Sequence, residues 1–155
     1  MKIKQGILKV NSLEEFLKDL GECAAVIDAK YVIDLDVVKF AAEKALKSWK
    51  EKRNIAKTLP LEILLYFSAT RQIRDAIKVG VKEGTNEAVV VILNNCEDKL
   101  KKYFEEKEVV KVDKARIENV KRLYGITDEE IKIVRLEKLP LLIMERIALF
   151  DVFKE

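Results

Sequence analysis

The sequence has no histidine and only two cysteines in 155 residues. Histidine is the usual general base near neutral pH and the commonest metal ligand. Its absence excludes catalysis by histidine and metal sites built on histidine. Cys23 and Cys96 lie far apart and form no CxxC motif, which excludes thioredoxin-like and zinc-ribbon folds. We interpret both cysteines as small buried hydrophobic residues, and the sequence leaves open whether they pair.

The sequence also lacks long apolar runs and any linker rich in glycine, serine or proline, with five glycines and two prolines in all. Hydrophobic residues make up 49% and charged residues 37%, the balance of one folded domain over residues 1–155. Disorder and a membrane span are excluded. No signal peptide is visible, so we expect a cytoplasmic protein, and the excess of Lys, Glu and Ile is typical of thermophiles such as archaea.

Four short segments have the composition of strands. Residues 88–93 are continuously apolar and β-branched, which predicts a strand at the centre of a sheet. Residues 24–28 form a second buried strand, residues 2–10 alternate weakly and fit an edge strand, and residues 109–112 form a short fourth strand.

Helices are predicted where apolar residues recur at helical spacing behind a capping residue such as Ser12, Asp34, Thr58 or Asp113. Thr127 begins a capping box with Glu three residues later. The predicted helices cover residues 13–20, 35–52, 59–67, 71–77, 97–106 and 114–124, with two more beginning after Thr127 and near Leu139. Interleaved strands and helices with an excess of helix predict a mixed α+β fold: a small central sheet packed with several helices.

The last predicted helix, from Leu139 to Phe153, has almost no polar face. A helix that is apolar all round must be covered all round. Either it is a central core helix, or one face packs inward and the other docks a partner protein. Its position at the chain end slightly favours docking, since terminal elements are rarely the innermost ones.

Basic residues gather in two segments, although the net charge of the chain is only +3. Lysine-rich segments are most often solvated helix faces. However, Arg71 and Arg74 lie near a predicted helix start, where acidic residues would suit the helix dipole better. Cations there favour a phosphate ligand held by backbone N–H groups and guanidinium forks. The two segments contain Lys47, Lys50, Lys52, Arg53 and Lys57, then Arg71, Arg74, Lys78 and Lys82.

No motif for catalysis or nucleotide binding is present: the sequence contains no GxxxxGK[ST], GxGxxG or GxSxG. Asp28, Asp34 and Asp36 form the one tempting group of carboxylates, but a turn and a helix cap explain them better. We therefore predict a binding protein with no enzymatic activity, no cofactor and no metal.

The order of several segments resembles the small kinase-binding subunit of the KEOPS complex. The resemblance begins with Val26-Ile27-Asp28, the Ala41–Ala45 helix and the stretch from Thr58 to Ser68. It continues through Gln72–Ile77, Gly80, Val89–Ile92, the segment from Asn119 to Thr127 and the apolar last helix. It covers most of the chain, and its specificity lies in the order and spacing of these segments rather than in one sharp motif.

The resemblance implies a non-catalytic subunit of the machinery that installs threonylcarbamoyladenosine on tRNA. Such a subunit binds the small atypical kinase/ATPase of the complex and binds tRNA, with the acceptor 3′ end as a recognised feature. The apolar last helix would dock the kinase, with Met144, Ile147, Phe150 and Phe153 as expected contacts.

For tRNA, the resemblance points to the region from Leu59 to Gly80. Arg71 and Arg74 are the first expected contacts, followed by Lys57, Lys78 and Lys82. The turn before the Gln72–Ile77 helix reads Ala69-Thr70-Arg71, where relatives carry glycine or asparagine, so its geometry is not implied by the resemblance. The alternative is a protein-interaction or small-ligand regulatory domain with no role in nucleic-acid binding.

Overall fold

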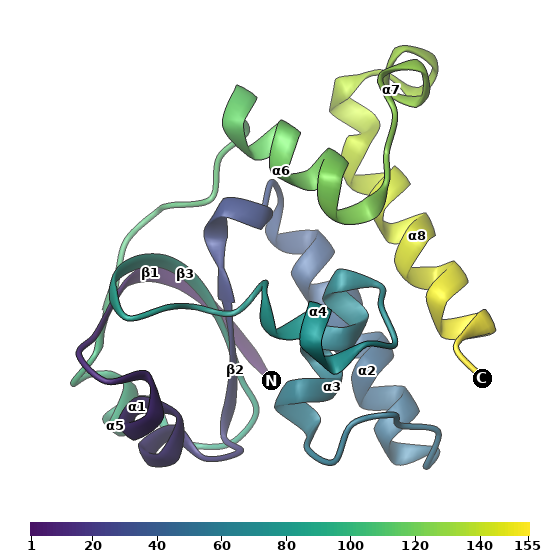
Figure 1. The fold of residues 1–155 in the computed structure, drawn as a ribbon. Helices are drawn as coiled ribbons and strands as arrows, with labels where there is room; N and C mark the ends of the chain where they lie inside the picture. Colours follow the sequence, from purple (N-terminus) through teal and green to yellow (C-terminus); the bar gives the residue numbers. More distant parts are fainter.

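The computed structural model describes residues 1–155 as one four-stranded antiparallel sheet with helices on both faces (Figure 1). The strands are β1 (Lys2–Val10), β2 (Ala24–Asp28), β3 (Gly84–Ile92) and β4 (Phe104–Glu106), in the spatial order β2-β3-β1-β4. The predicted mixed α+β fold is confirmed.

Strand β3 lies inside the sheet, as its β-branched sequence predicts. It pairs with β1 over nine positions, from Lys2 opposite Ile92 to Val10 opposite Gly84. The prediction that β1 is an edge strand is wrong, because β4 pairs with its other side. Gly6 permits this pairing, since a Cβ at that position would overlap the backbone carbonyl oxygen of Glu105.

Alternate residues of the strands point to two separate cores. Val89 and Val91 of β3 belong to a cluster of 24 buried residues on one face. Ala88, Val90 and Ile92 belong to a cluster of 12 on the other face. The sheet is therefore the middle layer between two layers of helices.

The larger layer contains α2 (Leu35–Lys50), α3 (Leu59–Ser68), α6 (Lys114–Tyr124) and α8 (Leu139–Phe153). The smaller layer contains α1 (Leu13–Leu20) and α5 (Glu97–Leu100), at the lower left of Figure 1. Helices α4 (Ile73–Ile77) and α7 (Asp128–Val134) are short, and 3-10 turns span Ala29–Tyr31 and Leu136–Lys138. No helix combines the length and the apolar character needed to span a bilayer.

The capping residues begin the helices where the sequence predicts them. The side chains of Ser12, Asp34, Thr58 and Asp113 each accept a hydrogen bond from a backbone N–H in the first turn of the following helix. Thr127 and Glu130 form the complete capping box.

Two local predictions between residues 97 and 112 are wrong. The predicted helix over 97–106 ends at Leu100, and Phe104–Glu106 joins the sheet as β4. The predicted strand at 109–112 does not form; instead, the Gln5 side chain accepts hydrogen bonds from the backbone N–H groups of Val109 and Val110, both at 2.8 Å. Pairing with β1 overrides the local helical spacing here.

Cys23 and Cys96 form a disulfide, with their Cα atoms 6.0 Å apart. Cys96 is buried in the smaller core, and Cys23 packs against it. The interpretation of both residues as simple buried hydrophobics is therefore wrong. The pairing of Ala24 with Ile92 brings these two chain segments together, and such a tertiary pairing is invisible in the spacing of the cysteines.

Candidate functional site

Helix α8 presents two different apolar faces. One face is buried in the larger core through Leu139, Leu142, Ile143 and Ile147. The other is exposed to solvent: the exposed fractions are 62% for Leu141, 45% for Leu149, 65% for Val152 and 73% for Phe153. We call these four residues the α8 stripe. The exposed face contradicts the alternative of a core helix covered on all sides, and docking of a partner on that face stays a prediction.

The four kinase contacts expected from the sequence differ in accessibility. Phe153 belongs to the α8 stripe, whereas Ile147 is fully buried and has no surface to offer a partner. Met144 is partly buried against the larger core. Phe150 is also partly buried and packs edge-to-face on Tyr66, with ring centroids 5.0 Å apart. Leu141, Leu149 and Val152 replace Ile147 on the accessible face.

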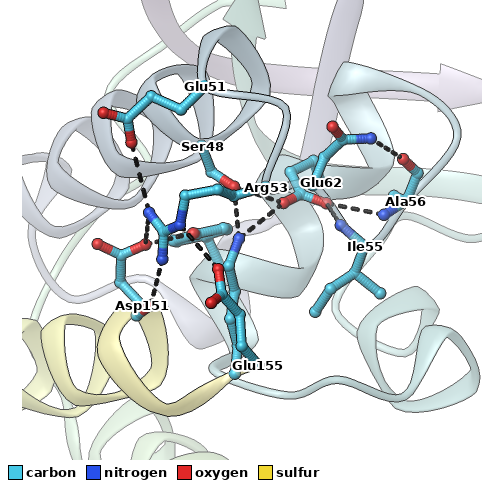
Figure 2. A network of polar contacts seen from close by, with 11 residues as sticks. Ser48, Glu51, Arg53, Ile55, Ala56, Glu62, Asp151 and Glu155 are labelled. Atoms are coloured by element: carbon cyan, nitrogen blue, oxygen red, sulfur yellow. Dashed lines mark hydrogen bonds and ion pairs between the residues drawn. The ribbon is translucent and has the colours of Figure 1, made fainter.

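A buried polar cluster holds the C-terminal end of α8 against α2 and α3 (Figure 2). We define this C-terminal latch as Ser48, Glu62 and Lys154. The Lys154 ammonium donates to the Ser48 hydroxyl and lies 3.5 Å from a Glu62 carboxylate oxygen, and all three side chains are buried. The other Glu62 oxygen accepts the backbone N–H groups of Ile55 at 3.0 Å and Ala56 at 2.8 Å.

A second group of polar contacts surrounds the latch. The Tyr66 hydroxyl donates to the Asp151 carboxylate. Burial, and then this hydrogen bond, raise the pKa of Tyr66 well above its ordinary value. Arg53 donates one hydrogen bond to the Glu155 carboxylate, at 2.8 Å, and another to the backbone carbonyl of Asp151, at 3.0 Å. Figure 2 shows these residues beside the last turn of α8.

The latch is not predicted from the sequence. One signal was available: Glu62 is the sole charged residue in the otherwise apolar helix Leu59–Ser68. A carboxylate is almost never buried without a partner. The partner lies 92 residues away, so the sequence could have marked Glu62 but could not have paired it.

Two neighbouring clefts meet at the turn that follows α3. The larger has a volume of about 780 Å³, and its lining includes Lys30, Lys78 and Arg122. The smaller, of about 330 Å³, includes Arg71 and Arg146. The clefts share Ser68, Ala69 and Leu123. We call the two together the basic groove.

The turn between the clefts has a defined shape. Ala69 ends α3 in the left-handed conformation, with φ 51° and ψ 44°. The Ser68 hydroxyl donates to the backbone carbonyl of Leu64 at 2.6 Å, so it points back into α3. The turn carries the chain away from α3 with its backbone at the junction of the two clefts.

The cations of the basic groove differ in how they are paired. Lys78 lies 3.3 Å from Asp75, and Arg146 makes two hydrogen bonds to Glu130, at 3.0 and 2.8 Å. These bonds lower the pKa of Glu130 below its ordinary value. Arg71 and Arg122 have no carboxylate within 4.0 Å. Arg71 is exposed, so its guanidinium is available to an anionic ligand.

The five tRNA contacts expected from the sequence are not all brought together. Arg71 and Lys78 line the basic groove, while Lys57, Arg74 and Lys82 are exposed outside its lining. The helix whose start suggested a phosphate site is α4, which has only five residues, and its cap residue makes no side-chain hydrogen bond. The groove therefore owes its positive charge to several elements rather than to that helix start.

Two of the three carboxylates singled out in the sequence act as caps, and Asp36 lies in the first turn of α2. Asp28 accepts the N–H of Lys30 at 3.0 Å, and Asp34 accepts the N–H of Asp36 at 2.8 Å. The structure brings no three acidic or cysteine side chains together in an arrangement that could hold a metal ion.

A family described as kinase binding protein CGI-121 matches residues 3–151. The chain belongs to this family. The KEOPS complex subunit Cgi121 of Pyrococcus abyssi (strain GE5 / Orsay) is 36% identical over 80 residues, which are 51% of this chain and 45% of that protein. The aligned part of the chain therefore spans about half of that relative's length. The resemblance deduced from the sequence is confirmed.

Proposed function

We propose that this chain is a non-catalytic subunit of a KEOPS complex and binds the atypical kinase of that complex through the α8 stripe. One observation carries the proposal: α8 buries one face in the core and leaves four large apolar side chains exposed, in a member of a kinase-binding family. Leu149, Val152 and Phe153 lie within the last two turns of α8, while Leu141 lies eight residues before Leu149 with the exposed Glu145 between them. Large exposed apolar side chains that gather on one helix mark protein interfaces. Aromatic residues such as Phe153 are enriched at the centres of such interfaces.

The second half of the proposal is that the basic groove binds tRNA, with the acceptor 3′ end as the recognised feature, in support of threonylcarbamoyladenosine modification. Arg71 and Arg122, which lack carboxylate partners, and Lys78 supply phosphate contacts without reading sequence. Tyr66 and Phe67 are fully buried, so neither is available to stack on an unpaired base.

The two surfaces adjoin. The smaller cleft of the basic groove is lined by Leu149 and Phe153 of the α8 stripe as well as by Arg71. A kinase seated on the stripe would therefore lie beside a tRNA in the groove. This arrangement suits a subunit that handles tRNA next to the kinase.

The kinase half is tested with purified kinase subunit by calorimetric titration. Val152→Glu should weaken binding by about tenfold or more, because it places a charge in the middle of an apolar interface. Val112→Glu is the matched control, since Val112 is 55% exposed and Val152 65%, and Val112 lies outside α8. Equal binding by both variants would contradict docking on α8.

The tRNA half is tested by binding total tRNA across a salt series, with intact and with trimmed 3′ ends. The Arg71→Glu, Lys78→Glu double variant should weaken binding and reduce the salt slope by about one for each lost phosphate contact. The Lys99→Glu, Lys102→Glu double variant makes the same change in charge in and just after α5, in the smaller layer and outside the lining of the groove, and should leave binding unchanged. No binding by the wild type at low salt would leave the protein-interaction alternative.

A further inference from the structure

The three cations that line the larger cleft of the basic groove differ in their surroundings. Lys78 lies 3.3 Å from an Asp75 carboxylate oxygen, and Lys30 lies 3.9 Å from an Asp28 oxygen. Arg122 is exposed and has no carboxylate within 4.0 Å. An anionic ligand of either lysine must therefore compete with a carboxylate that is already present, whereas a ligand of Arg122 meets no such competitor.

Two successive hydrogen bonds hold the Arg122 guanidinium. Asn119 and Arg122 lie three residues apart on α6, so their side chains share one face of the helix. Arg122 Nη2 donates to Asn119 Oδ1 at 2.8 Å, and Asn119 Nδ2 donates to the backbone carbonyl of Lys30 at 3.0 Å. The guanidinium is thus tied through Asn119 to the 3-10 turn Ala29–Tyr31, on the far side of α6's contact with the rest of the domain.

The position of Asn119 requires an amide side chain. A backbone carbonyl only accepts hydrogen bonds and a guanidinium only donates them, so the side chain that joins the two must do both. Asparagine meets this need with its Nδ2 toward Lys30 and its Oδ1 toward Arg122. Aspartate would place an oxygen against the carbonyl and pair its charge with Arg122, while alanine would join neither group.

Arg122 keeps free donors after this hydrogen bond. It uses one N–H on Asn119 and makes no other hydrogen bond, so its remaining N–H groups are available in the larger cleft that both residues line. A long exposed side chain loses rotamer freedom when it binds a ligand. Part of that ordering is already made here, because Asn119 holds one corner of the planar group.

We propose that Arg122 is the main phosphate contact of the larger cleft and that Asn119 is its positioning residue. The proposal rests on the tRNA binding proposed above, and it names the cation that meets the RNA backbone and the side chain that holds this cation in place. A phosphodiester oxygen accepts from the free N–H groups of Arg122. Asn119 acts on the ligand through Arg122 alone.

The test measures the affinity of 5′-labelled tRNA by fluorescence anisotropy across a salt series. Arg122→Ala should weaken binding about tenfold and reduce the salt slope by about one, because one phosphate contact is lost. Asn119→Ala should weaken binding about fivefold and leave the slope unchanged, since the charge of Arg122 remains. Asn119→Asp should reduce the slope as Arg122→Ala does, because its carboxylate pairs with the guanidinium. Lys114→Ala is the matched control and should leave binding unchanged, since Lys114 is an exposed cation of α6 outside the lining of the basic groove.

A double-mutant cycle separates positioning from a purely structural role. Because Asn119 acts through Arg122, Asn119→Ala should have no further effect on affinity in the Arg122→Ala background. An equal loss in both backgrounds, or an unchanged salt slope in Asn119→Asp, would overturn the proposal. Circular dichroism checks that each variant is folded.

The same assay separates this proposal from the proposed function. If Arg122→Ala leaves tRNA affinity unchanged while the Arg71→Glu, Lys78→Glu variant lowers it, the basic groove still binds tRNA and only the roles of Arg122 and Asn119 fail. Absence of tRNA binding by the wild type would overturn both proposals.

Discussion

Glu62→Ala should destabilise the protein more than Lys154→Met, although Glu62 and Lys154 form one buried ion pair. Glu62→Ala removes the only carboxylate within 4.0 Å of the Lys154 ammonium. The ammonium keeps two partners, the Ser48 hydroxyl and the Tyr66 ring, whose centroid lies 4.7 Å from Nζ. It also removes the acceptor of two backbone N–H groups, those of Ile55 and Ala56.

Lys154→Met leaves the remaining charged group, the Glu62 carboxylate, with more hydrogen-bond partners. The Glu62 carboxylate keeps three donors: the N–H groups of Ile55 and Ala56 and the hydroxyl of Ser48, the last at 3.3 Å. Methionine also fills much of the space of the lysine stem. We expect a loss of about 3 kcal/mol in the free energy of unfolding for Lys154→Met, the lower end for one missing partner of a buried pair. For Glu62→Ala we expect about 5 kcal/mol, since unsatisfied backbone donors add to the unpaired charge.

Urea unfolding at neutral pH, followed by circular dichroism, measures both losses. Glu62→Gln is the intermediate case, because its amide oxygen still accepts from the backbone while the charge is gone. The expected order of stability is wild type, Lys154→Met, Glu62→Gln, Glu62→Ala. A Lys154→Met variant as unstable as Glu62→Ala would refute the reasoning, because the backbone donors would then contribute nothing.

Three further predictions concern the rest of the fold. The Cys23→Ser, Cys96→Ser double variant should lose about 4 kcal/mol of unfolding free energy, because the disulfide spans 73 residues; an unchanged calorimetric midpoint would contradict this. Gly6→Ala should separate β4 from β1, seen as faster hydrogen exchange confined to β4. Arg146 lowers the pKa of Glu130, so this pair stabilises the fold above about pH 4.5, and the contribution is lost as the pH falls through the folded-state pKa. Glu130→Gln should therefore make urea stability less dependent on pH in this range, and an unchanged profile would speak against the pair.

Features set by neighbouring residues could be predicted from the sequence. A helix cap needs only one side chain and the next three backbone N–H groups, so Ser12, Asp34, Thr58, Asp113 and Thr127 were all assigned correctly. A continuous β-branched run needs burial on both faces, which placed β3 inside the sheet.

Features set by distant pairing could not be predicted. Phe104 continues a helical spacing of apolar residues from Leu100, yet it lies opposite Leu8 as part of β4. The disulfide depends on the same kind of pairing, since Cys23 and Cys96 meet only because β2 lies beside the end of β3. Local patterns contain no information about either partner.

The site was predictable in its elements but not in its residues. Helix α8 has almost no polar face, because its three charged residues, Glu145, Arg146 and Asp151, are spread around it, so its sequence has no clear periodicity to say which side meets the core. Ile147 and Val152 look equally suited to a partner, but Ile147 is fully buried and Val152 is 65% exposed. The sequence also does not say which basic residues come together. Arg71 and Lys78 line the basic groove, while Lys57 and Lys82 lie outside its lining.

The helix α3 connects the latch to both proposed binding surfaces. Glu62, in its first turn, holds Lys154 and hence the end of α8; Ser68, in its last turn, lines both clefts of the basic groove. Damage to the latch should therefore reach both surfaces, whereas Val152→Glu alters one exposed side chain only. Lys154 lines the smaller cleft itself, whereas Glu62 lines neither cleft, so Glu62→Gln is the cleaner test. If Glu62→Gln weakens kinase and tRNA binding together while Val152→Glu weakens kinase binding alone, α3 and α8 position the two surfaces as one unit.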